Sequence, residues 1–202
     1  MEASDHTKPL AGIFFGVWPS LRGHAAGRLG ILLSKSLGEV RIMPMLQRYL
    51  TRDLVIIALT AVLWWLLAAR SAGTGFGADF SGWVVGALLF FCAHIVHEWG
   101  HYLGAVLTGS RVGIHRKLSS PFFFRFEAEG NSLKQFIAMS FGGFLATGAT
   151  IAFYYLGLPD EYLASRIGRG GALFGAFLGV TLELPLLLTG IFQGQVPAKA
   201  AV

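Results

Sequence analysis

Long apolar runs separated by short polar segments dominate residues 51–194 of the chain. A helix that crosses a membrane needs about 20 mostly apolar residues. Four segments meet or approach that length, from about Leu54 to Gly73, Gly82 to Thr108, Leu133 to Leu158 and Gly171 to Phe192. This pattern predicts an all-α membrane protein, a bundle of about four transmembrane helices.

The segments outside these runs have a different character. Residues 1–50 mix glycine, serine and arginine without clear periodicity, which predicts a basic cytosolic tail that is a candidate for disorder. Residues 51–194 form the predicted core and residues 195–202 a short C-terminal tail. Between the second and third runs, residues 119–130 carry alternating aromatics, typical of a short β-hairpin or re-entrant loop. A plain aromatic patch at the membrane interface explains the same pattern equally well.

Composition agrees with a membrane location. Hydrophobic residues make up 54% of the 202 residues and charged residues 13%, whereas soluble domains carry about 25% charged residues. The net charge of +5 does not indicate nucleic-acid binding, because the basic residues flank the apolar runs. Cys92 is the only cysteine, which excludes an internal disulfide and a cysteine zinc cluster.

The flanking charges predict an orientation. Basic residues prefer the cytoplasmic side. The first run is preceded by Arg41, Arg48 and Arg52. The segment between the second and third runs is rich in basic residues: Arg111, Arg116, Lys117, Arg125 and Lys134. The segment between the third and fourth runs mixes basic with acidic residues: Arg166, Arg169, Asp160 and Glu161. We expect cytoplasmic N- and C-termini and a plasma (inner) membrane location.

The second apolar run contains the pattern His97-Glu98-Trp99-Gly100-His101. Residues four apart lie on one face of a helix, so His97 and His101 can bind one metal ion. Zinc makes a bound water more acidic, and Glu98 is placed to accept its proton as general base and to protonate the leaving amine. The pattern therefore predicts a Zn²⁺-dependent peptidase.

The membrane setting sharpens this interpretation, because ionisable residues are costly inside a bilayer and usually functional. The alternative is a polar contact between helices or a proton relay. His94 lies three residues before His97. It is a candidate to hydrogen bond a ligand, to stabilise a transition state, to act as an alternative ligand, or to be a satisfied core histidine.

A catalytic zinc usually has three protein ligands, and Glu183 is the only acid inside another apolar run. By helix arithmetic, His101 and Glu183 lie roughly 10 Å and 14 Å from the cytoplasmic ends of their helices. Glycines at 171, 175 and 179 lead up to Glu183, a spacing that allows close helix approach. We predict Glu183 as the third ligand, with a helix break at Pro185 helping to aim it; the alternative is a buried polar contact with a histidine.

At this point the chain resembles the site-2 protease family of intramembrane zinc metalloproteases over roughly residues 83–192. The resemblance rests on the motif at 97–101 within an apolar run. Leu107 to Val112 is similar to the turn after the family's catalytic helix, and Gly142 to Ala146 is similar to a glycine-rich helix start.

The chain also departs from that family. The family supplies its third ligand as an aspartate before a glycine, after an asparagine–proline segment. Here Thr189 stands before Gly190, and threonine is a poor zinc ligand. Either Glu183 substitutes or the site is impaired. No PDZ-like insertion is visible, so the resemblance is to a minimal core.

The resemblance implies cleavage of a membrane-protein substrate helix within the lipid bilayer, as in regulated intramembrane proteolysis. The aromatic segment, through Phe124 and Phe126, is a candidate to bind the unwound substrate as an added strand.

Other functions remain open. One is an inactive, protease-like scaffold that binds partner helices; retention of Glu98 argues against it, because a scaffold needs no general base. A di-iron oxygenase needs more histidines than the three at 94, 97 and 101. A metal or proton transporter would need a series of acidic residues along a path through the membrane, and this sequence does not show one. The sequence does not predict the oligomeric state.

Overall fold

The computed structural model describes the backbone of residues 20–197 and the side chains of residues 43–197. It divides into two units, Met1–Met43 and Pro44–Val202. The described part of the first is the start of helix α1 (Ser20–Leu67), and every residue discussed below belongs to the second. Residues 1–19 of the predicted tail and 198–202 of the C-terminal tail lie outside the described residues. Residues 20–50 are helical in the structure, within the segment 1–50 that the sequence analysis named as a basic tail and a candidate for disorder.

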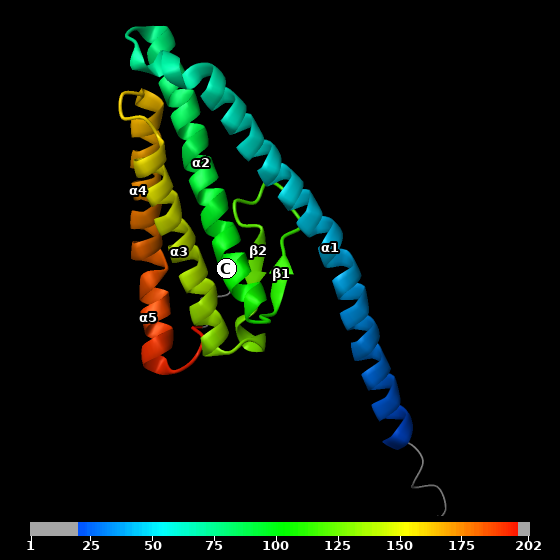
Figure 1. The fold of residues 1–202 in the computed structure, drawn as a ribbon. Helices are drawn as coiled ribbons and strands as arrows, with labels where there is room; N and C mark the ends of the chain where they lie inside the picture. Colours follow the sequence, from blue (N-terminus) through cyan, green and yellow to red (C-terminus); the bar gives the residue numbers. More distant parts are fainter. Residues whose placement is uncertain (1–19, 198–202) are drawn as a thin grey trace, which may run out of the picture. The chain divides into compact units, whose positions relative to one another are not determined.

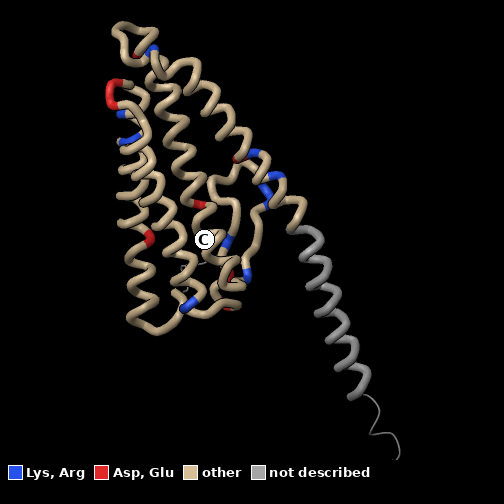
Figure 2. Tube along the Cα trace, viewed as in Figure 1, with Lys and Arg blue, Asp and Glu red and all other residues tan. Residues whose placement is uncertain are grey.

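Four helices in the described part of the chain are long and apolar enough to cross a membrane: Met43–Ala72, Phe76–Leu107, Leu133–Gly157 and Leu163–Gln193. The first joins α1 to the 3-10 helix η1 (Ala68–Ala72); the next two are α2 and α3; the last joins α4 (Leu163–Leu182) to α5 (Leu184–Gln193). The expected bundle of four apolar helices is confirmed, and it is consistent with an integral membrane protein. Lys and Arg lie mostly towards the helix ends and in the connecting segments (Figure 2). Glu98 lies within α2, and Glu183 lies where α4 meets α5.

The fourth apolar helix begins at Leu163, eight residues before the predicted start at Gly171. Arg166 and Arg169, which the charge pattern placed in a loop, therefore lie in α4. Arg169 is buried and donates hydrogen bonds to the carbonyls of Tyr154 (2.9 Å) and Leu158 (2.5 Å) at the end of α3, besides pairing with Asp160. These partners accept hydrogen bonds from the Arg169 guanidinium, so the residue can lie in an apolar helix although a hydropathy pattern places it in a loop.

Helix α2 packs closely against both α3 and α4, and the three lie side by side (Figure 1). Glycine makes the α2–α3 approach feasible. A methyl group added at Gly100 or Gly142 would overlap the carbonyl of the other, and one at Gly104 would overlap the carbonyl of Ala138. The backbones of α2 and α3 are therefore in direct contact along the half of α2 that carries the histidine motif.

A two-stranded antiparallel sheet follows α2, formed by β1 (Val112–Ile114) and β2 (Phe124–Phe126). A hairpin was among the sequence predictions, but β1 lies upstream of the predicted segment. The sheet is followed by the 3-10 turn η2 (Ala128–Gly130). Phe123, Phe124 and Phe126 are buried in a core with Tyr49 of α1 and Phe136 of α3.

Candidate metal centre

Two histidines of α2 point at each other one turn apart. The Nε2 atoms of His97 and His101 are 3.0 Å apart, and their rings lie nearly perpendicular. The i, i+4 spacing of the motif produces this pairing, because α2 runs unbroken through both residues. The predicted histidine pair is thus assembled on one helix.

Glu183 approaches both histidines from the junction of α4 and α5. Its Oε1 is 3.1 Å from His97 Nε2 and its Oε2 is 3.1 Å from His101 Nε2. The helix is interrupted at Glu183 because Pro185 lacks an N–H and its ring crowds the preceding turn. The structure brings the three predicted ligands within 4.8 Å of one another. Thr189 is absent from the group; its hydroxyl donates to the Pro185 carbonyl.

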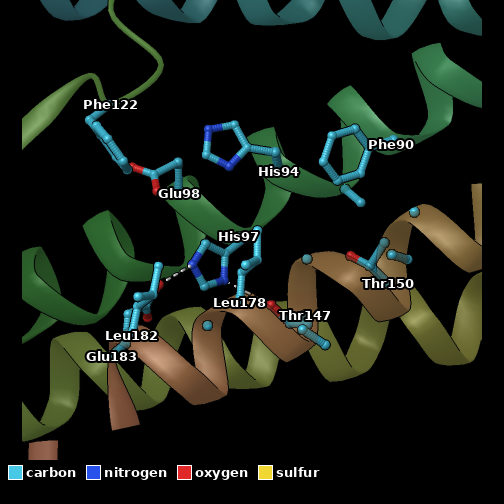
Figure 3. A pocket seen from close by; sticks show the side chains of 16 residues that line it. Phe90, His94, His97, Glu98, Phe122, Thr147, Thr150, Leu178, Leu182 and Glu183 are labelled. Carbon is cyan, nitrogen blue, oxygen red and sulfur yellow. Dashed lines mark hydrogen bonds and ion pairs between the residues drawn. The ribbon is translucent and has the colours of Figure 1, made fainter. Parts of the chain in front are cut away.

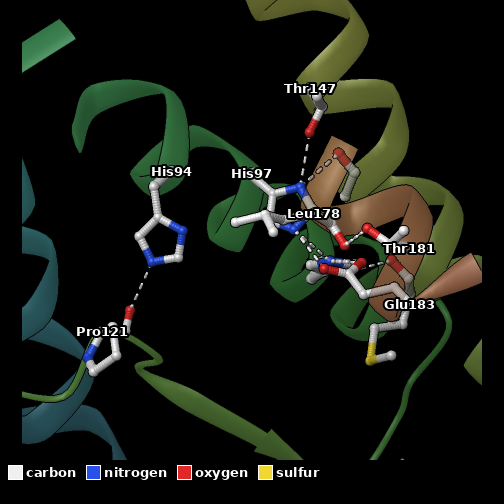
Figure 4. A network of polar contacts seen from close by, with 10 residues as sticks. His94, His97, Pro121, Thr147, Leu178, Thr181 and Glu183 are labelled. Carbon is white, nitrogen blue, oxygen red and sulfur yellow. Dashed lines mark hydrogen bonds and ion pairs between the residues drawn. The ribbon is translucent and has the colours of Figure 1, made fainter. Parts of the chain in front are cut away.

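The outer nitrogen of each histidine faces a backbone carbonyl of α3. His101 Nδ1 is 2.9 Å from the Met139 carbonyl, and His97 Nδ1 is 3.2 Å from that of Gly143. His97 Nδ1 is also 2.8 Å from the Thr147 hydroxyl (Figure 4). A carbonyl can only accept, so each Nδ1 carries the hydrogen. In a neutral imidazole, Nε2 is then left with a free lone pair.

This tautomer makes the cluster suitable for a cation. Two Nε2 lone pairs and a carboxylate converge on one point, where they repel one another unless something positive lies between them. A single proton can bridge only two of these three groups, whereas a divalent metal ion can bind both imidazole nitrogens and the carboxylate at once. Histidine ligands held through Nδ1 by carbonyls are typical of metal sites in proteins. The donor set fits zinc, although two nitrogens and a carboxylate also suit other transition metals.

Glu98 lies beside this cluster and is buried. It shares one cavity with His97 and Glu183 and another with His101 and Glu183. In Figure 3 it lies next to His97, with Phe122 alongside. Within the described residues no group donates a hydrogen bond to its carboxylate, so that carboxylate is open to a water molecule in the cavity.

His94 lies apart from the cluster. Its Nε2 is 3.3 Å from the Pro121 carbonyl (Figure 4). Its ring meets that of Phe122 edge-on. It therefore contacts the loop before β2 rather than a ligand, and it lines the cavity next to His97. A role as alternative ligand receives no support from this placement.

Phe124 and Phe126 line the cavity next to His101, together with Phe122 and residues of α3. Their side chains are also packed into the core. The sequence identified both as candidates for substrate contact, and their burial adds a structural role. Arg125 between them is exposed.

Several residues that build the site escaped the sequence analysis. Thr147 reaches His97 from α3, which no spacing within α2 reveals. Asp53 of α1 is buried and accepts a hydrogen bond from the Trp99 indole (2.8 Å), inside the histidine motif. Its position, an acid at the start of the first apolar run, is the signal in the sequence that could have identified Asp53.

Comparisons with models of protein families, with curated proteins and with solved structures found no match to this chain.

Proposed function

We propose that this protein is an intramembrane zinc metalloendopeptidase, in which His97, His101 and Glu183 hold the metal and Glu98 is the general base. One observation carries the proposal: three metal-binding groups with free lone pairs converge beside a buried carboxylate, within helices apolar enough to span a membrane. A polar contact between helices requires neither the shared tautomer nor the adjacent carboxylate.

When bound, zinc would polarise the scissile carbonyl and make a water molecule more acidic. Glu98 would accept the proton of that water and deliver it to the leaving amine. Met139, Gly143 and Thr147 would hold the histidine rings in place. The apolar surroundings limit bulk water, so the chemistry depends on water admitted to the two cavities.

The substrate we propose is an unwound segment of a membrane-protein helix. The sheet supports this idea. His115 N–H bonds the Phe123 carbonyl (2.9 Å) and Glu127 N–H bonds the Arg111 carbonyl (3.3 Å). By the alternation of an antiparallel ladder, the peptide groups of Phe124 and Phe126 point to the open edge of β2, where an extended chain can pair.

The test is the zinc content of the purified protein in detergent, for the parent and for single variants. About one zinc per chain is expected in the parent and in Glu98→Gln, and much less in His97→Ala, His101→Ala and Glu183→Ala. Cleavage of a panel of transmembrane reporters should then occur with the parent and stop in Glu98→Gln. A parent that stays metal-free after zinc loading would overturn the proposal and favour the inactive scaffold.

A further inference from the structure

A cavity of about 200 Å³ lies between α2 and α4 beside the proposed metal site. Its walls include Phe90 and His94 of α2, Thr147 of α3, and Gly175 and Gly179 of α4, with His97, Glu98 and Glu183 at one end (Figure 3). An engineered protein cavity of about 150 Å³ holds a benzene molecule. This cavity is therefore large enough for a phenylalanine-sized side chain.

The space exists because the α4 wall is mainly glycine and alanine, although Leu178 and Leu182 also line the cavity. Nearer the start of α4, the helices touch: a methyl group added at Gly168 would overlap Leu89, and one at Gly171 would crowd Phe90. At Gly175 the nearest atom to an added methyl is Phe90 Cε2 at 3.7 Å, and at Gly179 it is 3.8 Å away. The two helices pack closely at one end and leave a gap next to the cluster.

A second cavity of about 270 Å³ lies beside His101, and the two share Glu98, Phe122, Leu182 and Glu183. Successive side chains of an extended peptide point to opposite faces. A peptide whose scissile carbonyl lies at the shared part would direct neighbouring side chains towards different cavities. The second cavity is walled by aromatic side chains, including Phe124 and Phe136, whereas the wall of the first on α4 is mainly glycine and alanine.

We infer that the α2–α4 cavity binds one large apolar side chain of the substrate, of leucine or phenylalanine size, adjacent to the scissile bond, and that Gly175 sets its depth. This inference rests on the proposed function. It makes Gly175 a specificity-determining residue, because any longer side chain there would occupy the space that the substrate side chain needs.

The test uses zinc-loaded protein and three substituted succinyl hydroxamates, which bind zinc and carry a methyl, isobutyl or benzyl side chain. Binding is measured by titration in detergent. Gly175→Leu should weaken the isobutyl and benzyl compounds roughly tenfold or more, the usual effect of overpacking. Its affinity for the methyl compound should change less than about threefold, and its zinc content should not change. The affinity of Gly175→Ala for the isobutyl and benzyl compounds should lie between that of the parent and that of Gly175→Leu.

Gly170→Leu is the matched control, because it makes the same change on the same helix at an exposed position with nothing near. It should bind all three compounds like the parent. Ala176→Leu, which fills the cavity from a neighbouring position, replaces Gly175→Leu if that variant does not fold. If both filled variants bind the benzyl compound as the parent does, the inference is wrong. A parent that binds no zinc overturns the proposed function, and this inference with it.

Discussion

At the scale of single residues, the centre depends on how each histidine ring is held. His97 Nδ1 has two partners on α3, the Gly143 carbonyl and the Thr147 hydroxyl, whereas His101 Nδ1 has the Met139 carbonyl. Such partners fix the tautomer that leaves Nε2 free, and losing one typically lowers metal affinity 10- to 100-fold. The Thr147 hydroxyl is the only one of these three partners that a mutation can remove without moving the backbone.

We therefore expect Thr147→Val to lower zinc affinity by about tenfold, at the lower end of that range because the Gly143 carbonyl remains. Competition with a chelator measures the affinity. Thr147→Ser keeps the hydroxyl and should stay within about threefold of the parent. Equal affinities of the valine and serine variants would show that the hydroxyl does not support His97.

Gly143 gives a second prediction at this scale. A methyl group added there would overlap the His101 ring, whereas one added at Gly148 on the same helix meets nothing within 4 Å. Gly143→Ala should displace His101 and lower zinc affinity at least tenfold, by the size of effect seen when a ligand's support is lost. Gly148→Ala should leave zinc binding unchanged. Because alanine favours helix over glycine at both sites, a loss confined to Gly143→Ala cannot come from helix propensity.

Sequence reasoning was strongest where the chemistry lies on one helix. The spacing of His97 and His101 predicts their pairing, and helix depth identified Glu183 as the third group. Thr147 and Met139 could not be found in that way, because a hydroxyl and a carbonyl on another helix carry no signal until the register of α2 against α3 is known. That register depends on Gly100, Gly104 and neighbouring backbone, which hydropathy does not resolve.

At the scale of elements, α1 is attached to the motif helix through a buried polar group. The Asp53 carboxylate accepts hydrogen bonds from Trp99 Nε1 (2.8 Å) and from Arg52 Nε (2.7 Å). Arg52 also donates to the Leu118 and Ser120 carbonyls, in the loop that leads to Phe122. Asp53 thus links α1 to the motif helix, and the neighbouring Arg52 links α1 to the loop that borders the proposed site.

Asp53→Leu should lower the free energy of unfolding in detergent by about 1–3 kcal/mol, because it leaves the Trp99 indole N–H and the Arg52 Nε–H without their acceptor. An SDS titration followed by tryptophan fluorescence measures the change. Asp53→Asn keeps an acceptor for Trp99 and should lose less stability. If the Asp53→Leu variant is as stable as the parent, the contact does not hold α1 in place.

Elements were predicted well in number and less well in extent. The four apolar runs correspond to four helices, because lipid-facing surface requires continuous apolar stretches. The start of α4 was missed because a charged residue such as Arg169 favours a loop in a hydropathy pattern. The structure shows that Arg169 is tolerated in the helix because it donates hydrogen bonds to the carbonyls of Tyr154 and Leu158. Pro185 did indicate the break at Glu183, since proline cannot continue the hydrogen-bond ladder. Strand β1 is too short and too weakly patterned to be recognised.

At the scale of the whole molecule, the proposed orientation places the metal centre in the half of the bundle nearer the cytoplasm. The sheet and its basic flanks, including Arg116 and Lys117, lie at the same end of α2 as the histidine motif, and α2 ends just before them. The opposite end carries Asp160 and Glu161 between α3 and α4. The excess of basic residues at one end favours that end as cytoplasmic, and a substrate would then be cut close to that surface.

Single reporter cysteines test this orientation in intact cells. Cys92 is buried, with its thiol 3.3 Å from the Thr60 hydroxyl, so it should stay unlabelled. Ser119 and Thr74 are both exposed and lie at opposite ends of α2. A membrane-impermeant maleimide should label Thr74→Cys in intact cells and Ser119→Cys only after lysis, because the charge bias places residue 119 inside. The reverse pattern would put the centre near the outer face and assign the cut to the opposite end of a substrate helix.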